Sequence, residues 1–551
     1  MNAAELFVEA LEKEGVKFIY AVPGEENLDF LEAVRKSSIS IILTRHEQCA
    51  GFMAATYGRL TGEVGVCLAT LGPGATNLLT AAAYADLGAF PMLMITGQKP
   101  IKNSKQGLFQ VINVVDMMRP VTKYTKQVVN VDKISALVRE AFRLSEEERP
   151  GACHIELPED IAKEPINKNT LRPFSKSIIE YPVATENLIN KACDMIQSAK
   201  FPLVLIGAGA NRLDKKGISY ALTKFINKTG LYFFNTQMGK GVVDEFSDKY
   251  LGTAALSEND YIHCAIDRSD LIINIGHDVI EKPPFFRGEN GKKVIHINSK
   301  TAAVDNVYFA DLELIGDIKV TIESLTNKLK KLEKDFSYYK KIKELLHAHI
   351  NEYADDNSFP IKPQKLVAEI QGIMPDDGII SLDNGIYKIW FARNYFARKP
   401  NTILLDNALA TMGAGLPAAM EAARLYPEKL VLSVCGDGGF MMNCQDLETA
   451  VRLNLNLIIL ILRDDAYGMI KWKQYGMGFQ DYGLNFNNPD FVKFAESFGV
   501  KACTLQKSDD LKEVIKKFHS QKGVCLIDIP IDYSENYKVL VDELRNKTCI
   551  L

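Results

Sequence analysis

The amino-acid sequence predicts an α/β protein built from three parallel-sheet domains. Three observations predict this class: short apolar runs alternate with helical stretches, several runs end in glycine-rich turns, and the pattern recurs in three consecutive blocks. Alternation at this spacing is typical of parallel sheets covered by helices on both faces. The chain has 551 residues, which is enough for three or four domains of ordinary size.

The first block, residues 1–165, is expected to form an N-terminal domain. Its apolar runs predict four strands, at 18–22, 39–43, 64–70 and 92–96. Helical patterns lie between these runs, for example at 27–36 and 48–60. A polar stretch with three prolines, 164–187, predicts a linker after this domain.

Two further blocks repeat the pattern. Residues 186–330 are expected to form a central Rossmann-like domain with strands at 203–206, 271–275 and 294–297. A surface helix within 328–353 and a linker at 354–363 lead into a C-terminal domain, 360–535. The strands expected there lie at 378–382, 402–405, 430–434, 457–462 and 524–529. A polar tail, 536–551, closes the chain and need not belong to the core.

Composition and charge exclude several classes of protein. Lysine and arginine (65) against aspartate and glutamate (69) give a net charge of −4, which disfavours general nucleic-acid binding. No apolar run approaches the roughly 18 residues of a membrane-spanning helix, and the acidic N-terminus does not resemble a secretory signal. The ten cysteines form no CxxC pair and no zinc-site spacing, so we expect reduced thiols in a cytoplasmic protein.

A glycine-rich turn at the end of the strand predicted at 430–434 carries the strongest chemical signal. This turn reads Gly436-Asp437-Gly438-Gly439. Glycines at the carboxyl end of a strand let backbone N–H groups approach a phosphate closely. A carboxylate between them would repel that phosphate unless a cation lay between the two, and Mg²⁺ prefers such oxygen ligands. Asp437 is therefore a candidate metal ligand beneath a diphosphate.

A second acidic turn supports this interpretation. The strand predicted at 457–462 ends in Arg463-Asp464-Asp465, and Asp464 lies 27 residues after Asp437. One strand–helix–strand unit occupies about this length and returns the chain to a neighbouring parallel position. Gly-Asp-Gly alone is most often an ordinary turn, but the two acidic turns together predict a Mg²⁺–diphosphate site.

These two turns resemble the thiamine-diphosphate signature, and the resemblance extends over nearly the whole chain. The sequence is most similar to the acetolactate synthase (acetohydroxyacid synthase) family, nearer its catabolic, FAD-independent type. The resemblance implies three domains that bind the pyrimidine, form a central accessory region and bind the diphosphate. It also implies active sites between the first domain of one subunit and the third domain of another, and hence a homodimer or homotetramer.

The resemblance assigns cofactor contacts to particular residues. Glu47 would contact N1′ of the pyrimidine, Met412 would wedge between the two rings, and the carbonyl of Ala410 would accept from the 4′-amino group. The carbonyl of Ala466 would complete the metal shell begun by Asp437 and Asp464. The remaining cofactor contacts implied by the resemblance are Gly385, Ile386, Tyr387, Gly438, Gly439 and Tyr467.

The chemistry expected of Glu47 has a physical basis. A carboxyl group bonded to N1′ favours the imino tautomer of the aminopyrimidine, and that imine can remove the proton of the weakly acidic thiazolium carbon. Alternative structural roles for Glu47 and Met412 stay open. Glu47 is also a first-turn helix glutamate of the kind that the helix dipole stabilises, and Met412 is also ordinary core filler.

Substrate contacts follow from the same resemblance. Phe109 and Gln110 resemble the substrate-facing loop of the synthases. The segment around Lys240 resembles one in the synthases, where a cation would lower the free-energy cost of binding a second keto-acid carboxylate. The alternative is that Lys240 is a solvated surface lysine. Trp472 stands where biosynthetic enzymes use tryptophan to prefer 2-ketobutyrate as acceptor; one methylene is worth only about 1–3 kcal/mol, and plain core packing is the alternative.

The expected reaction is the decarboxylating condensation of two pyruvates to 2-acetolactate and CO₂, with 2-ketobutyrate as a possible second acceptor. Thiamine diphosphate and Mg²⁺ are the expected cofactors, whereas FAD is not expected, because residues 276–283 lack the Arg-rich segment of the FAD-binding synthases. Another thiamine-dependent 2-keto-acid lyase or oxidase, such as pyruvate oxidase or a decarboxylase, is the alternative, although the chain lacks the adjacent histidine pair of simple decarboxylases. A non-catalytic nucleotide- or FAD-binding regulatory homologue is a second alternative, for which Gly207-Ala208-Gly209 is a weak hint. Branched-chain amino acid or acetoin biosynthesis, and the presence of a regulatory subunit, stay open.

Overall fold

The computed structural model describes residues 1–102, 107–166, 180–212, 217–277, 280–281, 292–303 and 308–546. Half of the segment used to assess FAD binding (276–283), namely Asp278, Val279, Lys282 and Pro283, lies outside these residues. The chain divides into two compact units. Unit 1 consists of Met1–Glu180, Ala408–Leu425 and Asn443–Leu455. Unit 2 consists of Tyr181–Asn407, Tyr426–Met442 and Asn456–Leu551.

Unit 1 contains a six-stranded parallel sheet in the order β2-β1-β3-β4-β6-β5. Its strands are β1 (Phe18–Ala21), β2 (Ser40–Leu43), β3 (Gly65–Ala69), β4 (Met92–Gln98), β5 (Tyr124–Gln127) and β6 (Ala152–Pro158). The three central strands β3, β4 and β6 are buried along their whole length, as expected for a sheet covered on both faces.

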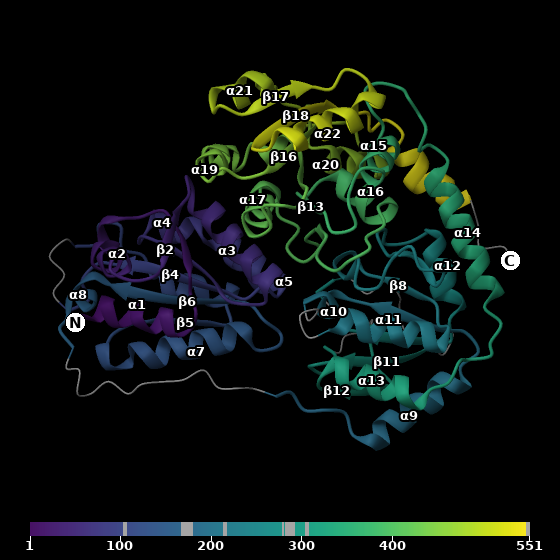
Figure 1. Ribbon diagram of the computed structural model, residues 1–551, viewed down its shortest axis with the longest axis horizontal. Helices are drawn as coiled ribbons and strands as arrows, with labels where there is room; N and C mark the ends of the chain where they lie inside the picture. The colour runs from purple at the N-terminus through teal and green to yellow at the C-terminus, as the bar shows by residue number, and fades with distance from the viewer. Residues whose placement is uncertain are drawn as a thin grey trace. The chain divides into compact units, whose positions relative to one another are not determined.

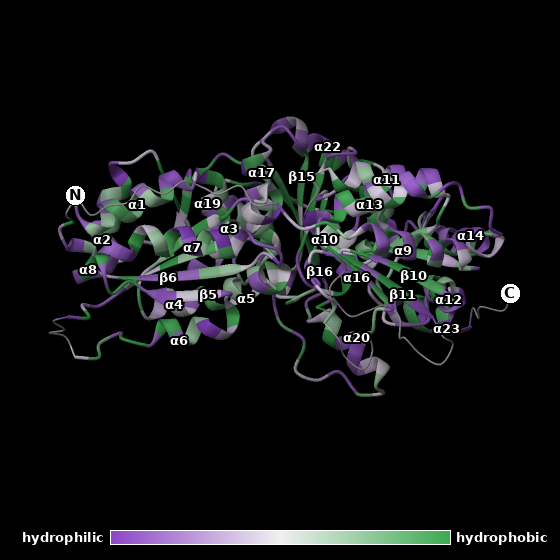
Figure 2. Ribbon diagram, turned by 90° about the horizontal axis from the view of Figure 1, so that it is seen from below, coloured by the Kyte–Doolittle hydropathy of each residue, from purple (hydrophilic) through white to green (hydrophobic). Residues whose placement is uncertain are grey.

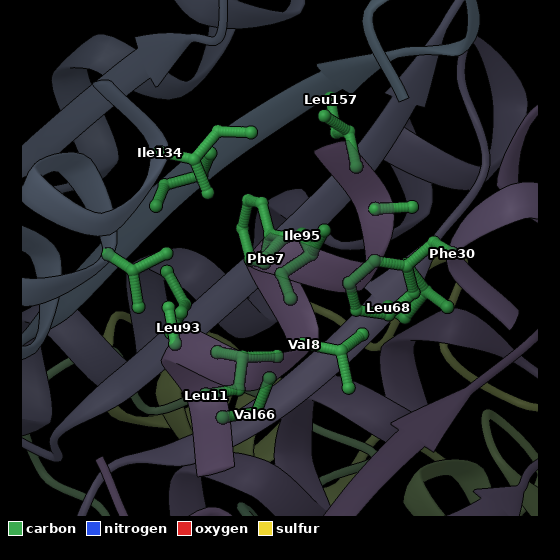
Figure 3. Packing of buried hydrophobic residues seen from close by; sticks show 14 of the residues in the cluster. Phe7, Val8, Leu11, Phe30, Val66, Leu68, Leu93, Ile95, Ile134 and Leu157 are labelled. Carbon is green, nitrogen blue, oxygen red and sulfur yellow. The ribbon is translucent and has the colours of Figure 1, made fainter. Parts of the chain in front are cut away.

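Helices cover both faces of this sheet (Figure 1). One face packs against α1 (Ala3–Lys13), α2 (Leu28–Arg35), α7 (Ile134–Glu146) and α8 (Glu159–Lys163). Figure 3 shows the core beneath them, where Phe7 and Leu11 of α1 meet Leu93 and Ile95 of β4. The other face packs against α3 (Glu47–Thr61) and α5 (Leu79–Gly88), and α3 also packs on α17 (Gly415–Leu425) within the same unit.

Unit 2 contains two further six-stranded parallel sheets. The first has the order β12-β11-β10-β7-β8-β9. Its strands are β7 (Pro202–Ile206), β8 (Phe233–Asn235), β9 (Tyr250–Thr253), β10 (Leu271–Ile275), β11 (Lys293–Asn298) and β12 (Leu312–Ile315). One face packs on α9 (Glu186–Ser198), α11 (Ile218–Thr229) and α13 (Ile318–Lys328), and the other on α12 (Tyr261–Arg268) and α14 (Ser337–Asn351). In Figure 2 strands β10 and β11 are hydrophobic, whereas α14 presents many hydrophilic residues.

The second sheet of unit 2 has the order β14-β13-β15-β16-β18-β17. Its strands are β13 (Ile379–Leu382), β14 (Ile403–Leu404), β15 (Val431–Gly436), β16 (Leu457–Arg463), β17 (Lys501–Thr504) and β18 (Val524–Pro530). β15 and β16 are parallel neighbours, with Gly436 opposite Leu462. This confirms the expectation that the turns after the two strands meet at one edge of a sheet. Three parallel sheets with covering helices also confirm the predicted α/β class.

The structure corrects one expectation, on the cysteines, and settles one open point, on the C-terminal tail. Cys264 in α12 is disulfide-bonded, so the expectation of reduced thiols fails at this residue, whereas the other described cysteines form no disulfide. The described part of the C-terminal tail is packed rather than detached, because Val539, Leu540 and Leu544 are buried. Among the residues that the structure describes, no helix has both the length and the apolar character needed to cross a membrane.

Candidate active site

Asp437 lies where β15 gives way to the short helix α18 (Asp437–Phe440), and it is 1% exposed. Its Oδ1 accepts a hydrogen bond from the Gly438 N–H (2.8 Å). Its Oδ2 accepts from the Asp465 N–H (2.8 Å) and from Nδ2 of Asn488 (2.8 Å). The carboxylate is thus held rigidly by neutral donors.

Asp464 lies at the end of the neighbouring strand β16. Burial, and after it the negative charge of Asp437, raises the pKa of Asp464 to about 7. Gly468 leaves room for this carboxylate, since a Cβ atom there would stand 2.7 Å from Asp464 Oδ2. Two half-buried or buried carboxylates that repel each other are the arrangement that a bound divalent cation relieves.

Glycines keep the backbone open around these aspartates. A Cβ atom at Gly439 would stand 2.1 Å from Asp383 Oδ2, and one at Gly438 would stand 2.9 Å from Cε1 of Tyr467. Tyr467 in turn packs edge-on against Phe486, with ring centroids 5.0 Å apart. Side chains are therefore excluded where backbone N–H groups would have to approach a phosphate.

The predicted second backbone contact lies beside this turn. Gly385 precedes helix α16 (Ile386–Asn394), and the buried Tyr387 hydroxyl accepts a hydrogen bond from the Gly436 N–H (2.9 Å). A Cβ atom at Gly385 would stand 2.4 Å from Cε1 of Tyr387. The Tyr387 side chain therefore ties the start of α16 to the end of β15, and this fixes the two glycine turns relative to each other.

The sequence analysis missed two residues of this region. Asn488 donates from Nδ2 to both Asp437 Oδ2 and Asp465 Oδ1 (2.7 Å). Tyr533 has a buried hydroxyl without a hydrogen-bond partner in the described part of the chain. Burial, followed by the charges of Asp464 and Asp437, raises its pKa well above the usual value. Tyr533 follows β18, the strand next to β16, so the rule that parallel strands end at a common edge could have found it.

These features fit a metal-bound diphosphate. Two facing carboxylates supply the hard oxygen ligands that Mg²⁺ prefers, and the orphaned Tyr533 hydroxyl points to a polar group that belongs beside them. Ala466, predicted to offer its carbonyl, is buried just after Asp464, where Asp465 adopts a left-handed backbone conformation (φ 54°).

Unit 1 holds the residues predicted for the pyrimidine end. Glu47 is the first residue of α3, and its Oε2 accepts a hydrogen bond from Nδ2 of Asn77 (2.9 Å). A Cβ atom at Gly74 would stand 3.2 Å from Glu47 Oε1. Asn77 therefore orients the carboxylate through one oxygen, and glycine keeps the space near the other oxygen open.

The loop 410–413 lies close to the start of α3 in the same unit. Asn443 donates from Nδ2 both to Gln48 Oε1 (3.0 Å) and to the Gly413 carbonyl (2.7 Å). Ala410 adopts a left-handed backbone conformation (φ 55°), and Met412 is only partly buried. Met412 is thus not fully enclosed by the described residues, and its place between the rings stays a prediction. Asn443 is another residue that sequence reasoning missed, because only the fold brings it to this loop.

Phe109 and Gln110 lie on an exposed loop of unit 1. Phe109 is 65% exposed, and Gln110 has a left-handed backbone (φ 59°) with its carbonyl 2.8 Å from the position of a Cβ atom at Gly72. A pocket of about 740 Å³ lies beside the loop and includes Leu108 and Val111 in its lining.

Lys240 and Trp472 are the remaining residues predicted to contact the substrate. Lys240 is 1% exposed, so it is not a solvated surface lysine; its Nζ donates to Glu245 Oε2 (2.7 Å) and Thr253 Oγ1 (3.0 Å). Contact between Lys240 and a substrate carboxylate stays a prediction, and this buried ion pair does not favour it. Trp472 lies on α20 (Gly468–Gly476) and is partly buried, and its contact with the acceptor stays a prediction.

Comparison with known families agrees with this geometry. Residues 1–117, 189–325 and 383–529 match the N-terminal thiamine pyrophosphate-binding, central and C-terminal thiamine pyrophosphate-binding domains of thiamine pyrophosphate enzymes. The C-terminal match includes both aspartates and the glycine turns described above.

Several known proteins resemble the chain over nearly their whole length. It is 32% identical to an acetolactate synthase of Bacillus subtilis, over 98% of this chain and 95% of that protein. It is 31% identical to a catabolic acetolactate synthase of Raoultella terrigena, over 97% and 96% of the two chains. It is 34% identical to a probable acetolactate synthase large subunit of Methanocaldococcus jannaschii, over 97% and 93%. Together, these likenesses and the three matching domains show that the chain belongs to the acetolactate synthase family of thiamine-diphosphate-dependent enzymes.

Proposed function

We propose that the enzyme condenses two molecules of pyruvate into 2-acetolactate with release of CO₂, and that it uses Mg²⁺ to hold the diphosphate of its cofactor. Membership of the family supports the carboligase activity and the use of thiamine diphosphate. The single observation that supports the residue assignment best is the meeting of Asp437 and Asp464 at the ends of neighbouring strands.

In this proposal Asp437 and Asp464 hold the metal together with the carbonyl of Ala466. The backbone of Gly438, Gly439 and the start of α16 (Gly385 to Tyr387) receives the diphosphate. Asn488 keeps the Asp437 carboxylate in place. The two negative charges then face a divalent cation instead of each other, and this removes the repulsion that, together with the larger effect of burial, raises the pKa of Asp464.

Glu47 is proposed to bind the pyrimidine end of the cofactor and to hold a proton at N1′. Thiamine diphosphate supplies a carbon nucleophile that adds to a 2-keto acid and accepts the electron pair left when CO₂ departs. Asn77 holds Oε2 of Glu47, so the other oxygen is oriented for this contact. Met412 and the carbonyl of Ala410 are proposed to position the rings.

Phe109, Gln110 and Trp472 are proposed to contact the acceptor, whereas Tyr467 is proposed to contact the cofactor. Exposed or partly buried aromatic and amide groups suit a small, flat keto acid, and the ring of Trp472 would decide between a methyl and an ethyl group. We also propose the domain boundaries 1–165, 186–330 and 360–535, a tail at 536–551, and a homodimer or homotetramer as the assembly.

Product analysis tests this function. The protein is incubated with pyruvate, thiamine diphosphate and Mg²⁺, with and without added FAD, and the products are identified. We expect 2-acetolactate and CO₂ in a ratio of one to one, independent of FAD. Acetaldehyde would instead indicate a decarboxylase, and acetate with peroxide would indicate an oxidase.

A further inference from the structure

The C-terminal segment of unit 2 packs along the end of helix α14. This segment forms the π-helix η9 (Lys538–Asp542) and the short helix α23 (Glu543–Asn546). Leu544 is buried in the same hydrophobic cluster as Ile342, Leu346 and Ile350 of α14. This packing brings Glu543 to the carboxyl end of α14.

A buried imidazole faces Glu543 there. The side chain of His349 is 1% exposed, and its Nε2 lies 3.1 Å from Glu543 Oε2. The ring of Tyr261 packs edge-on against the imidazole, with centroids 6.0 Å apart, and so restricts its orientation. The Tyr353 hydroxyl donates to the other oxygen, Oε1, of Glu543 (3.1 Å). Glu543 is therefore held so that Oε2 points toward the imidazole nitrogen.

A third ligand comes from the same helix. Glu352 lies three residues after His349, so the two side chains share one face of the helix end. One imidazole nitrogen of His349 and one carboxylate oxygen from each of Glu352 and Glu543 lie within 4.8 Å of one another. The carboxyl end of a helix is also the end whose dipole favours a cation.

We propose that His349, Glu352 and Glu543 bind one divalent transition-metal ion of the zinc type, which fastens the C-terminal segment to α14. Zinc bonds histidine nitrogen and carboxylate oxygen at about 2.0–2.2 Å, so tetrahedral ligand atoms stand roughly 3.3 Å apart. The observed 3.1 Å between His349 Nε2 and Glu543 Oε2 agrees with this spacing. Mg²⁺ and Ca²⁺ prefer oxygen ligands alone, so the imidazole selects against them.

The exposed side chain of Glu352 leaves the remaining coordination position open to water. One nitrogen, two carboxylate oxygens and one water make a complete tetrahedral set for zinc. The role is structural, because the metal joins two elements of unit 2 that are already packed through Leu544. It is also independent of the carboligase reaction proposed above, which uses other residues.

Cobalt titration of the full-length holoenzyme tests the proposal. Thiamine diphosphate and excess Mg²⁺ are present throughout, so that the carboxylates of the proposed diphosphate site are saturated. We expect one equivalent of Co²⁺ to give the visible absorption bands of a tetrahedral site, Zn²⁺ to displace it, and Zn²⁺ to raise the midpoint of thermal unfolding.

Substitutions of single residues test which side chains bind the metal. Glu352→Gln changes an exposed side chain and should not disturb folding, and we expect it to weaken Co²⁺ binding more than tenfold. His349→Gln should abolish the bands. His519→Gln is the matched control, because it removes an exposed histidine of α22 (Leu511–Gln521) and should bind Co²⁺ like the wild type.

Three results would overturn the proposal. The first is the absence of a stoichiometric cobalt signal in the wild type. The second is equal binding in the wild type, Glu352→Gln and His349→Gln. The third is a thiolate charge-transfer band in the near ultraviolet, because it would place the metal on cysteines instead.

Discussion

Two buried groups of carboxylates in unit 2 are stabilised in opposite ways. Glu245 receives four hydrogen bonds, from the Lys240 ammonium (2.7 Å), Asn235 Nδ2 (2.8 Å) and the backbone N–H groups of Gly241 (2.9 Å) and Ala397 (2.8 Å). Its charge is balanced within the protein. Asp437 is equally buried but receives only neutral donors, and it faces a second acid, Asp464.

The difference separates a structural ion pair from a binding site. A buried carboxylate paired with lysine contributes to the fold and leaves nothing for a ligand to neutralise. A pair of adjacent carboxylates without a cation costs stability, and a divalent ion removes that cost when it binds. Substitutions in the first group should therefore change stability, and substitutions in the second should change activity.

Glu47→Gln should give the largest effect. The amide keeps the shape and the bond with Asn77 but cannot hold a proton at N1′ as a carboxylate does, so we expect kcat to fall by at least about 1000-fold. Glu47 would then resemble Asp437 and Asp464, whose substitution should change activity, rather than Glu245, whose substitution should change stability. Steady-state acetolactate formation measures the loss, and the midpoint of thermal unfolding should stay within about 2 °C of the wild type. Wild-type turnover in this variant would remove the proposed role.

Glu245→Gln should destabilise the fold instead. The substitution leaves the Lys240 ammonium buried without a counter-charge, which typically costs about 3–5 kcal/mol. Urea unfolding measures this loss. The double variant Lys240→Met/Glu245→Gln, which removes both charges, should recover at least half of it.

The same double variant decides the role of Lys240. If Lys240 serves only the ion pair, kcat/KM for pyruvate in the folded double variant should stay within a few-fold of the wild type. A loss of about 100-fold or more with normal unfolding behaviour would instead support the predicted contact with a substrate carboxylate.

His154 offers a buried group that is kept neutral. Its two ring nitrogens bond to Thr96 Oγ1 (2.8 Å) and Thr125 Oγ1 (2.7 Å), and burial lowers its pKa to about 3. Between pH 6.5 and 3 the unfolded chain binds a proton that the folded chain does not, so stability falls as the pH falls through this range. This group should contribute about 2 kcal/mol to the difference in unfolding free energy between pH 7 and pH 5.

Urea unfolding at the two pH values tests this. His154→Gln should lose stability at pH 7, because its buried hydrogen bonds are disturbed, but should lose about 2 kcal/mol less than the wild type on going to pH 5. His519→Gln, at an exposed position, should follow the wild type. An unchanged pH dependence in His154→Gln would contradict the assignment.

Trp472→Leu should have the smallest effect on catalysis, and it should not change the contacts of Glu245 or of Asp437 and Asp464. We expect the ratio of kcat/KM for 2-ketobutyrate over pyruvate as acceptor to change by about tenfold, because one methylene is worth about 1–3 kcal/mol in such a pocket. Competition between the two acceptors, followed by product analysis, measures the ratio. The same ratio in both proteins would place Trp472 outside the acceptor site.

The sequence predicted most of the diphosphate region because its signals are local. Asp437 and Asp464 each follow a strongly apolar strand, and the length between them fixes β15 and β16 as neighbours. By contrast, β6 was missed because His154 and Glu156 interrupt its apolar run, although every residue of the strand is buried. Short strands such as β8 and β12 give too few residues for a clear pattern.

Residues held only by tertiary contacts could not be found in this way. Asn443 and Asn488 lie in loops without a periodic pattern, and their partners are distant in sequence. The burial of Lys240 depends on Glu245, Thr253 and the neighbouring backbone, which the sequence around Lys240 does not reveal.

Calorimetric titration of thiamine diphosphate into the wild type and Asp464→Asn, with saturating Mg²⁺ and with EDTA, tests the central claim most directly. Removal of Mg²⁺ should weaken cofactor binding by the wild type about 100-fold or more, since the metal neutralises both the aspartates and the diphosphate. Asp464→Asn should bind weakly in both conditions and show little response to Mg²⁺, with its fold intact by circular dichroism. Wild-type affinity and the same Mg²⁺ dependence in Asp464→Asn would contradict the claim that Asp437 and Asp464 hold a metal-bound diphosphate.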